Sequence, residues 1–105
     1  MSARAQAAWL PAGQRLHLHH GPIDLIIGAE GADRMAAFAR AEQRFATVLD
    51  ELVTELPLLR QPVEAGPNGA VARRMWHAVW PHRGCFVTPM AAVAGAVADT
   101  VLEAM

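Results

Sequence analysis

Lysine, tyrosine and serine are almost or wholly missing from this chain of 105 residues. All nine basic residues are arginine, there is no tyrosine, and the only serine is Ser2. Without a lysine amine, the chain has neither a Schiff-base catalyst nor the lysine of a phosphate-binding P-loop. A lone serine at the second position also argues against a serine nucleophile.

Cysteine and long apolar runs are scarce as well. Cys85 is the only cysteine, which excludes an intrachain disulfide and agrees with a reducing compartment. The longest apolar run, residues 87–98, contains Pro89 and Gly95 and is shorter than the roughly 20 residues that span a bilayer. The run before Pro11 is too short for a signal peptide. We therefore expect a cytoplasmic protein with no membrane partner.

The charge balance is close to neutral, with a formal net charge of −1. The chain lacks the excess of positive charge that is typical of nucleic-acid-binding proteins, so we expect a small-molecule ligand and no nucleic-acid partner. A hydrophobic fraction of 53% with 18% charged residues indicates a folded chain. The length allows one domain, residues 1–105, in which the alanine-rich residues 1–13 form a loose lead-in.

The first half of the chain predicts a β-hairpin and a long helix. Residues 14–20 alternate between apolar and polar side chains, and residues 23–27 are more continuously apolar, so we expect the second strand to be the more buried one. Gly21-Pro22 supplies the turn. Apolar residues with the 3.6-residue period predict a helix over residues 33–56, which Asp33 caps and Pro57 ends.

Two further helices follow, so the fold class is α+β, with an antiparallel β-hairpin followed by three helices. Val71, Met75 and Val79 lie four residues apart and predict a helix over residues 70–80. Thr88 as N-cap and Pro89 at the first helical position predict a last helix that runs to the end of the chain.

This last helix carries two stripes of side chains. Val93, Val97 and Val101 make an apolar stripe, and Ala91, Gly95 and Ala98 make a stripe with almost no side chain. A glycine inside a helix costs about 1 kcal/mol relative to alanine. A helix with that cost usually lets a strand or a ligand come close.

Histidine and cysteine are weak candidates for chemistry. His17 and His19 share one face of the first strand and His20 points to the other, so they form at best half of a zinc site that His77 or His82 must complete. We interpret all three as exposed strand residues and predict no metal site. Cys85 is a nucleophile if His82 activates it, but we favour a small buried hydrophobe.

The start of the last helix is a better candidate. The free amides after Pro89, with Gly84 upstream and Thr88 as cap, offer a site for an anion, to which Arg73, Arg74 and Arg83 would add charge. Asp99 is either a solvent-facing carboxylate or a ligand or structural hydrogen-bond acceptor.

From Arg15 onward the chain resembles an uncharacterised protein family related to the ApbE-type flavin transferases. Four segments carry the resemblance: GPIDL at 21–25, ELPLLR at 55–60, VARRM at 71–75, and FVTPMAAVAGAVAD at 86–99. The last is the longest and the most specific.

The resemblance implies part of an ApbE-like, T-fold-like domain with a flavin or nucleotide pocket beside the last helix. ApbE-type enzymes bind FAD and, with Mg²⁺, transfer FMN to a threonine of a target protein. Their helix motif, G-x-[IA]-A-K-G-x-A-x-D, places its last aspartate on Asp99, its second glycine on Gly95 and its lysine on Ala94. The family's metal-binding residues would lie beyond Met105, so we expect the chain to be an N-terminal portion of a longer protein.

The resemblance thus implies that Gly84, Thr88, Gly95 and Asp99 bind FAD or FMN, with Mg²⁺ only if the full-length site is present. It leaves open whether the chain is an enzyme. The alternative interpretation is a non-enzymatic module, a homo-oligomer that associates through apolar helix faces such as the Val93, Val97 and Val101 stripe.

Overall fold

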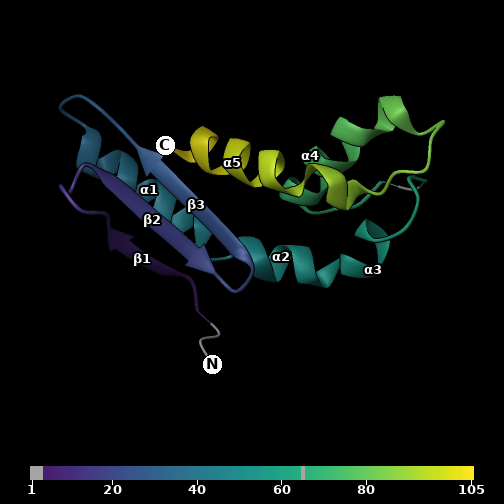
Figure 1. Cartoon of the computed structure of the whole chain (residues 1–105), viewed down its shortest axis with the longest axis horizontal. Coiled ribbons are helices and arrows are strands. Elements are labelled where there is room, and N and C mark those ends of the chain that lie inside the picture. The colour runs from purple at the N-terminus through teal and green to yellow at the C-terminus, as the bar shows by residue number, and fades with distance from the viewer. Residues whose placement is uncertain (1–3, 65) are drawn as a thin grey trace. The chain divides into compact units, whose positions relative to one another are not determined.

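The computed structural model describes residues 4–64 and 66–105 and has an α+β fold, as the sequence predicts (Figure 1). A three-stranded antiparallel sheet precedes the helices. The elements are, in order, β1 (Gln6–Trp9), β2 (Arg15–His20), β3 (Ile23–Gly28), α1 (Arg34–Phe45), α2 (Val48–Thr54), α3 (Leu56–Leu59), α4 (Ala70–Val79), the 3₁₀ turns η1 (Trp80–His82) and η2 (Pro89–Ala92), and α5 (Val93–Ala104).

The chain forms two compact units, which are described one at a time. The first unit comprises Met1–Leu49 with Val101–Met105, and the second comprises Asp50–Thr100. The boundaries between the units therefore fall inside α2 and α5. The expectation of a single domain over residues 1–105 stays a prediction. Among the described residues, no helix has the length and apolar character needed to cross a membrane.

The predicted hairpin of β2 and β3 is confirmed, but the sheet has an additional strand that the sequence did not indicate. Residues 6–9, expected within a loose lead-in, form β1 and pair antiparallel with β2, so that Ala8 lies opposite His17. A tight turn connects the two strands, and Ala12 has a φ of 81° there. Residues other than glycine rarely adopt this left-handed conformation, so an alanine at position 12 does not indicate the turn.

Burial along the sheet reverses one expectation. In β2, Leu16, Leu18 and His20 are buried, whereas in β3 only Ile27 is buried and Ile26 is 56% exposed. The strand expected to be more buried is thus the more exposed one. The strand order β1-β2-β3 explains the difference, because β2 is the central strand and β3 is at an edge. The burial of His20 also contradicts its interpretation as an exposed residue.

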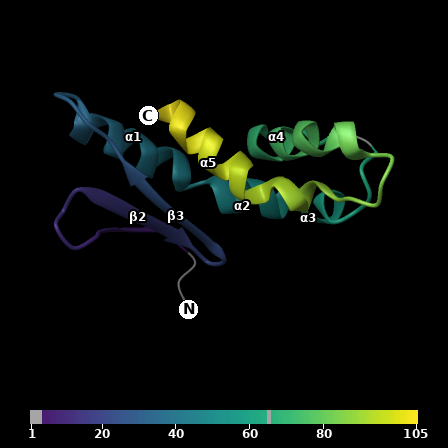
Figure 2. The ribbon, with the colours of Figure 1, turned by 45° about the horizontal axis from the view of Figure 1, so that its top comes forward.

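Helix α1 covers one face of the sheet (Figure 2). Phe38, Ala41 and Phe45 are buried, and the Trp9 ring contacts Phe38 edge-on with 5.0 Å between ring centroids. The expected continuous helix over residues 33–56 is wrong, because α1 ends at Phe45 and two shorter helices follow. Pro57 does not end a helix but lies in the first turn of α3, where the missing amide hydrogen is tolerated. Asp33 precedes α1 but makes no side-chain capping hydrogen bond.

The second unit contains the predicted helix α4, whose buried residues Val71, Met75 and Val79 confirm the expected period. Its N-terminus is capped from elsewhere in the chain. The carboxylate of Glu55 accepts hydrogen bonds from the backbone amides of Asn68 (2.7 Å) and Gly69 (2.6 Å). Negative charge at this end of a helix is favourable, because the first amides have no partner inside the helix.

The last helix begins more gradually than expected. Thr88 is extended and Pro89–Ala92 form the 3₁₀ turn η2 before α5 starts at Val93. The Thr88 hydroxyl makes no capping hydrogen bond, contrary to our expectation, and the Ala91 amide donates instead to the Thr88 carbonyl at 3.1 Å. Val97 and Val101 are buried, as expected for the apolar stripe.

Candidate functional site

The four residues predicted to bind a cofactor all lie in the second unit. Gly84 follows η1 in an exposed turn, and Thr88 is half-buried directly before η2. Gly95 and Asp99 are four residues apart on α5 and both are exposed, so they share one side of the helix. The structure therefore brings Gly95 and Asp99 together, with Gly84 and Thr88 in the segment that leads into the helix.

The exposed side of η2 and of the first turns of α5 has almost no side chains, whereas Leu102, two turns after Gly95 on the same side, is 68% exposed. Ala91, Ala94 and Gly95 are all exposed, and a Cβ atom built on Gly95 would meet no heavy atom within 4 Å apart from its chain neighbours and the adjacent backbone of its own helix. The residues described by the structure thus provide no neighbour that requires a glycine at this position. We call the surface formed by Ala91, Ala94, Gly95 and Asp99 the small-residue face.

Asp99 supplies the charge of the small-residue face. Its carboxylate forms no hydrogen bond or ion pair with another described residue. Both carboxylate oxygens are therefore open to accept hydrogen bonds from a ligand.

Arg83, which was expected to add charge near Thr88, is held elsewhere. Its guanidinium lies 4.2 Å from the centre of the Trp80 ring and donates a hydrogen bond to the Trp80 carbonyl at 2.9 Å. Trp80 in turn stacks on Trp76, with 4.7 Å between ring centroids. This row of aromatic rings on α4 and η1 had no signal in the sequence beyond the spacing of the two tryptophans.

The histidines on β2 are placed as expected with respect to one another. His17 and His19 stack on the same face, with 5.1 Å between ring centroids, and His17 contacts the carboxylate of Asp24. Within residues 4–64 and 66–105, no group of three or more His, Cys, Asp or Glu side chains could hold a metal ion. The favoured interpretation of Cys85 as a buried residue is wrong, since its side chain is exposed.

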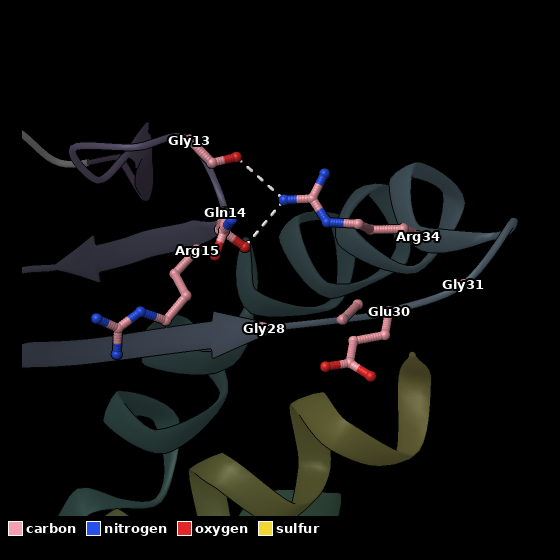
Figure 3. Close-up of a pocket in the computed structure, with 8 residues that line it drawn as sticks. Gly13, Gln14, Arg15, Gly28, Glu30, Gly31 and Arg34 are labelled. Carbon is pink, nitrogen blue, oxygen red and sulfur yellow. Dashed lines mark hydrogen bonds between the residues drawn. The ribbon is translucent and has the colours of Figure 1, made fainter.

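A hollow of about 970 Å³ lies in the first unit, between the start of β2 and the loop that joins β3 to α1 (Figure 3). Arg15, Glu30 and Arg34 are its charged residues, and Gly13, Gly28 and Gly31 are among the residues that line it. No local pattern in the sequence indicates this hollow, because its two walls are separated by more than ten residues of chain.

Arg34 connects the two walls of the hollow. Its Nη2 donates hydrogen bonds to the carbonyls of Gly13 (3.0 Å) and Gln14 (2.9 Å), as Figure 3 shows. The same guanidinium lies over the rings of Phe38 and Trp9, at 4.8 and 5.6 Å from their centres. These contacts hold the turn before β2 against the start of α1.

Comparison with known proteins gives one result. A family model described as AbpE bacteria matches residues 7–105. Neither the curated proteins nor the solved structures contain a match to this chain.

Proposed function

The chain belongs to the AbpE bacteria family, and from this premise we propose that it binds a small planar ligand, a flavin or a nucleotide, on the small-residue face of α5. The supporting observation is Gly95. A glycine inside a helix lowers stability by roughly 0.5–1 kcal/mol relative to alanine. Because a Cβ atom at this position would meet no described atom within 4 Å apart from its chain neighbours and the adjacent backbone of its own helix, packing inside the chain does not account for this cost.

A ligand on this face accounts for the glycine. A flat aromatic ring needs to approach the helix backbone closely, and a side chain at position 95 would hold it away. The alanines at positions 91 and 94 are exposed beside the glycine, and their short side chains project little from the backbone. Asp99, one helical turn further along, would accept hydrogen bonds from N–H or hydroxyl groups at the edge of the ring.

The resemblance of the sequence to ApbE-type flavin transferases makes a flavin the first ligand to test. We limit the proposal to binding. Ala94 stands where the transferase motif has lysine, and the described residues contain no cluster that could hold Mg²⁺. We therefore assign no transfer step to this chain.

Thermal unfolding with and without FAD or FMN tests the proposal. A ligand at about 100 times its Kd adds roughly 2.7 kcal/mol to the free energy of unfolding, which raises the Tm of a small domain by several degrees. We expect such a rise for the wild type, independent of added Mg²⁺.

A leucine at position 95 provides the matched variant. Leucine favours the helix more than glycine does, so Gly95→Leu should fold, while its side chain covers the small-residue face. Ala78→Leu, at an exposed position of α4, is the control. The proposal predicts that Gly95→Leu loses the flavin-dependent rise in Tm and that Ala78→Leu keeps it. An equal rise in both variants would refute it.

Association through apolar helix faces is the second candidate, and the structure changes where it should be sought. Val97 and Val101 are buried and Val93 is half-buried, so most of the valine stripe is not free for a partner. Leu102 on α5 is 68% exposed and remains available. Sedimentation velocity over a range of concentrations tests this candidate. A dimer that Leu102→Ser converts to a monomer would support it, and a monomer at every concentration would remove it.

A further inference from the structure

We propose that the hollow between the start of β2 and the β3–α1 loop binds a small zwitterion, a molecule that carries both a carboxylate and an ammonium group, as a free amino acid does. The inference concerns the first unit alone and is independent of the small-residue face. It depends on which charged side chains around the hollow form hydrogen bonds within the chain and which do not.

Three of the eight residues that line the hollow are glycines. A Cβ atom on Gly13 or Gly31 would meet nothing within 4 Å, so both glycines border open space. Their φ angles of 68° and 96° are in the region that favours glycine, so the turns that form the rim depend on these residues. A ligand in the hollow can therefore approach peptide groups without a side chain in the way.

Arg34 is a fixed part of this wall. Two of its hydrogen bonds are to backbone carbonyls, and two aromatic rings lie against its guanidinium. It is also only partly exposed. Its role is to hold the hollow open and to supply a constant positive charge at one side.

Arg15 and Glu30 are different, because neither side chain has a partner among the described residues. Both residues are exposed, and neither the guanidinium of Arg15 nor the carboxylate of Glu30 forms a hydrogen bond or an ion pair with another residue that the structure describes. Arg15 is opposite Gly28 in the register of β2 and β3, and its Cγ would lie 3.8 Å from a Cβ on that glycine. The stem of Arg15 therefore lies beside Gly28, which also lines the hollow. In Figure 3 the Arg15 guanidinium is on the other side of Gly28 from Glu30.

Opposite charges that border one hollow without pairing to each other are complementary to a ligand that carries both charges. The carboxylate of a zwitterion would pair with the guanidinium of Arg15, which can donate two parallel hydrogen bonds. Its ammonium group would pair with the carboxylate of Glu30. A ligand that is only anionic would leave Glu30 without a partner, and a ligand that is only cationic would leave Arg15 without one and would be repelled by both arginines.

The probe is 4-aminobutyrate, titrated into the ¹⁵N-labelled full chain and followed by the amide resonances of Gly13, Gly28 and Gly31. Glycine and 6-aminohexanoate vary the separation of the two charges. Butyrate and butylamine carry one charge each and serve as matched controls. Since an exposed ion pair contributes a factor of up to about five in affinity, we expect at least one zwitterion to bind a few-fold more tightly than either control.

Two variants separate the roles of the charges. In Glu30→Gln the zwitterion should bind no better than butyrate, and in Arg15→Gln it should bind no better than butylamine. Glu64→Gln, at an exposed position of the second unit, should leave the preference unchanged. Because the side chains of Arg15 and Glu30 make no hydrogen bond or ion pair with the described residues, the spectra of both variants should otherwise match the wild type.

Three results would overturn the proposal. The first is that the amide resonances of Gly13, Gly28 and Gly31 do not shift at tens of millimolar zwitterion. The second is that butyrate or butylamine binds the wild type as tightly as every zwitterion tested. The third is that Glu30→Gln keeps the full preference for the zwitterion. The first would show that the hollow is only a depression of the surface.

Discussion

Glu55 and Asp99 are two carboxylates of the same compact unit, and they are used in opposite ways. Glu55 is half-buried and accepts two hydrogen bonds from the amides that precede α4. Asp99 is exposed and has no partner among the described residues. The carboxylate of Glu55 therefore stabilises the fold, whereas that of Asp99 is free to bind a ligand. Arg34 and Arg15 show the same contrast in the first unit.

Removal of the Glu55 carboxylate should have the largest effect on stability. Glu55→Ala leaves two backbone amides without a partner, and a charged hydrogen bond contributes about 1.5–3 kcal/mol. We expect a loss of roughly 2 kcal/mol, which lowers the Tm of a small domain by about 10 °C. Thermal unfolding measures this loss. Glu64→Ala, at an exposed position of the same unit, is the control and should change the Tm by little.

The arginine pair should show a smaller difference in the same direction. Arg34→Gln loses hydrogen bonds to two carbonyls and its position over two aromatic rings, at a cost of about 1–2 kcal/mol. Arg15→Gln loses no contact and should stay within about 0.5 kcal/mol of the wild type. Urea unfolding of the two variants measures both values. Equal stabilities would show that Arg34 does not hold the first unit together.

Gly95→Ala should increase the free energy of unfolding. An increase is expected if the small-residue face is open, and a decrease if another part of the protein packs against it. Alanine relieves the cost of a glycine in the helix, so we expect a gain of about 0.5–1 kcal/mol. A loss of stability would mean that another part of the protein packs against this position. Thermal unfolding of the variant without ligand decides between the two outcomes.

Asp99→Asn should have the smallest effect on folding and a clear effect on binding. A substitution at an exposed position without partners normally changes stability by no more than about 0.5 kcal/mol. The amide keeps the size of the side chain but offers one acceptor oxygen in place of two. We expect an unchanged Tm without ligand and a weaker response to flavin. An unchanged response would remove Asp99 from the proposed site.

Local patterns predicted the elements that depend on neighbours in the sequence. The four-residue spacing of Val71, Met75 and Val79 located α4, and the Gly21-Pro22 turn located the hairpin. Contacts between distant segments left no such signal. Glu55 is separated by 13 and 14 residues from the amides that it caps, so its role could not be read from the chain.

The sequence pattern also predicts the burial of a strand wrongly where burial depends on the position of that strand in the sheet. The apolar run of β3 resembles a buried strand, but β3 is at the edge of the sheet, and only the fold shows which strand is central. For the candidate site, the helix, Gly95 and Asp99 could be anticipated from residue types and the family resemblance. The hollow beside Arg15 could not, because it depends on how two separate turns meet.

The most direct test of the account is the fluorescence anisotropy of FMN and FAD titrated with the wild type, Gly95→Leu and Ala78→Leu. Flavin fluorescence reports binding without reference to stability, so it separates loss of the site from loss of the fold. The account predicts a saturable rise in anisotropy with the wild type and with Ala78→Leu, and none with Gly95→Leu. The same rise with all three proteins, or with none of them, would contradict a flavin site on the small-residue face.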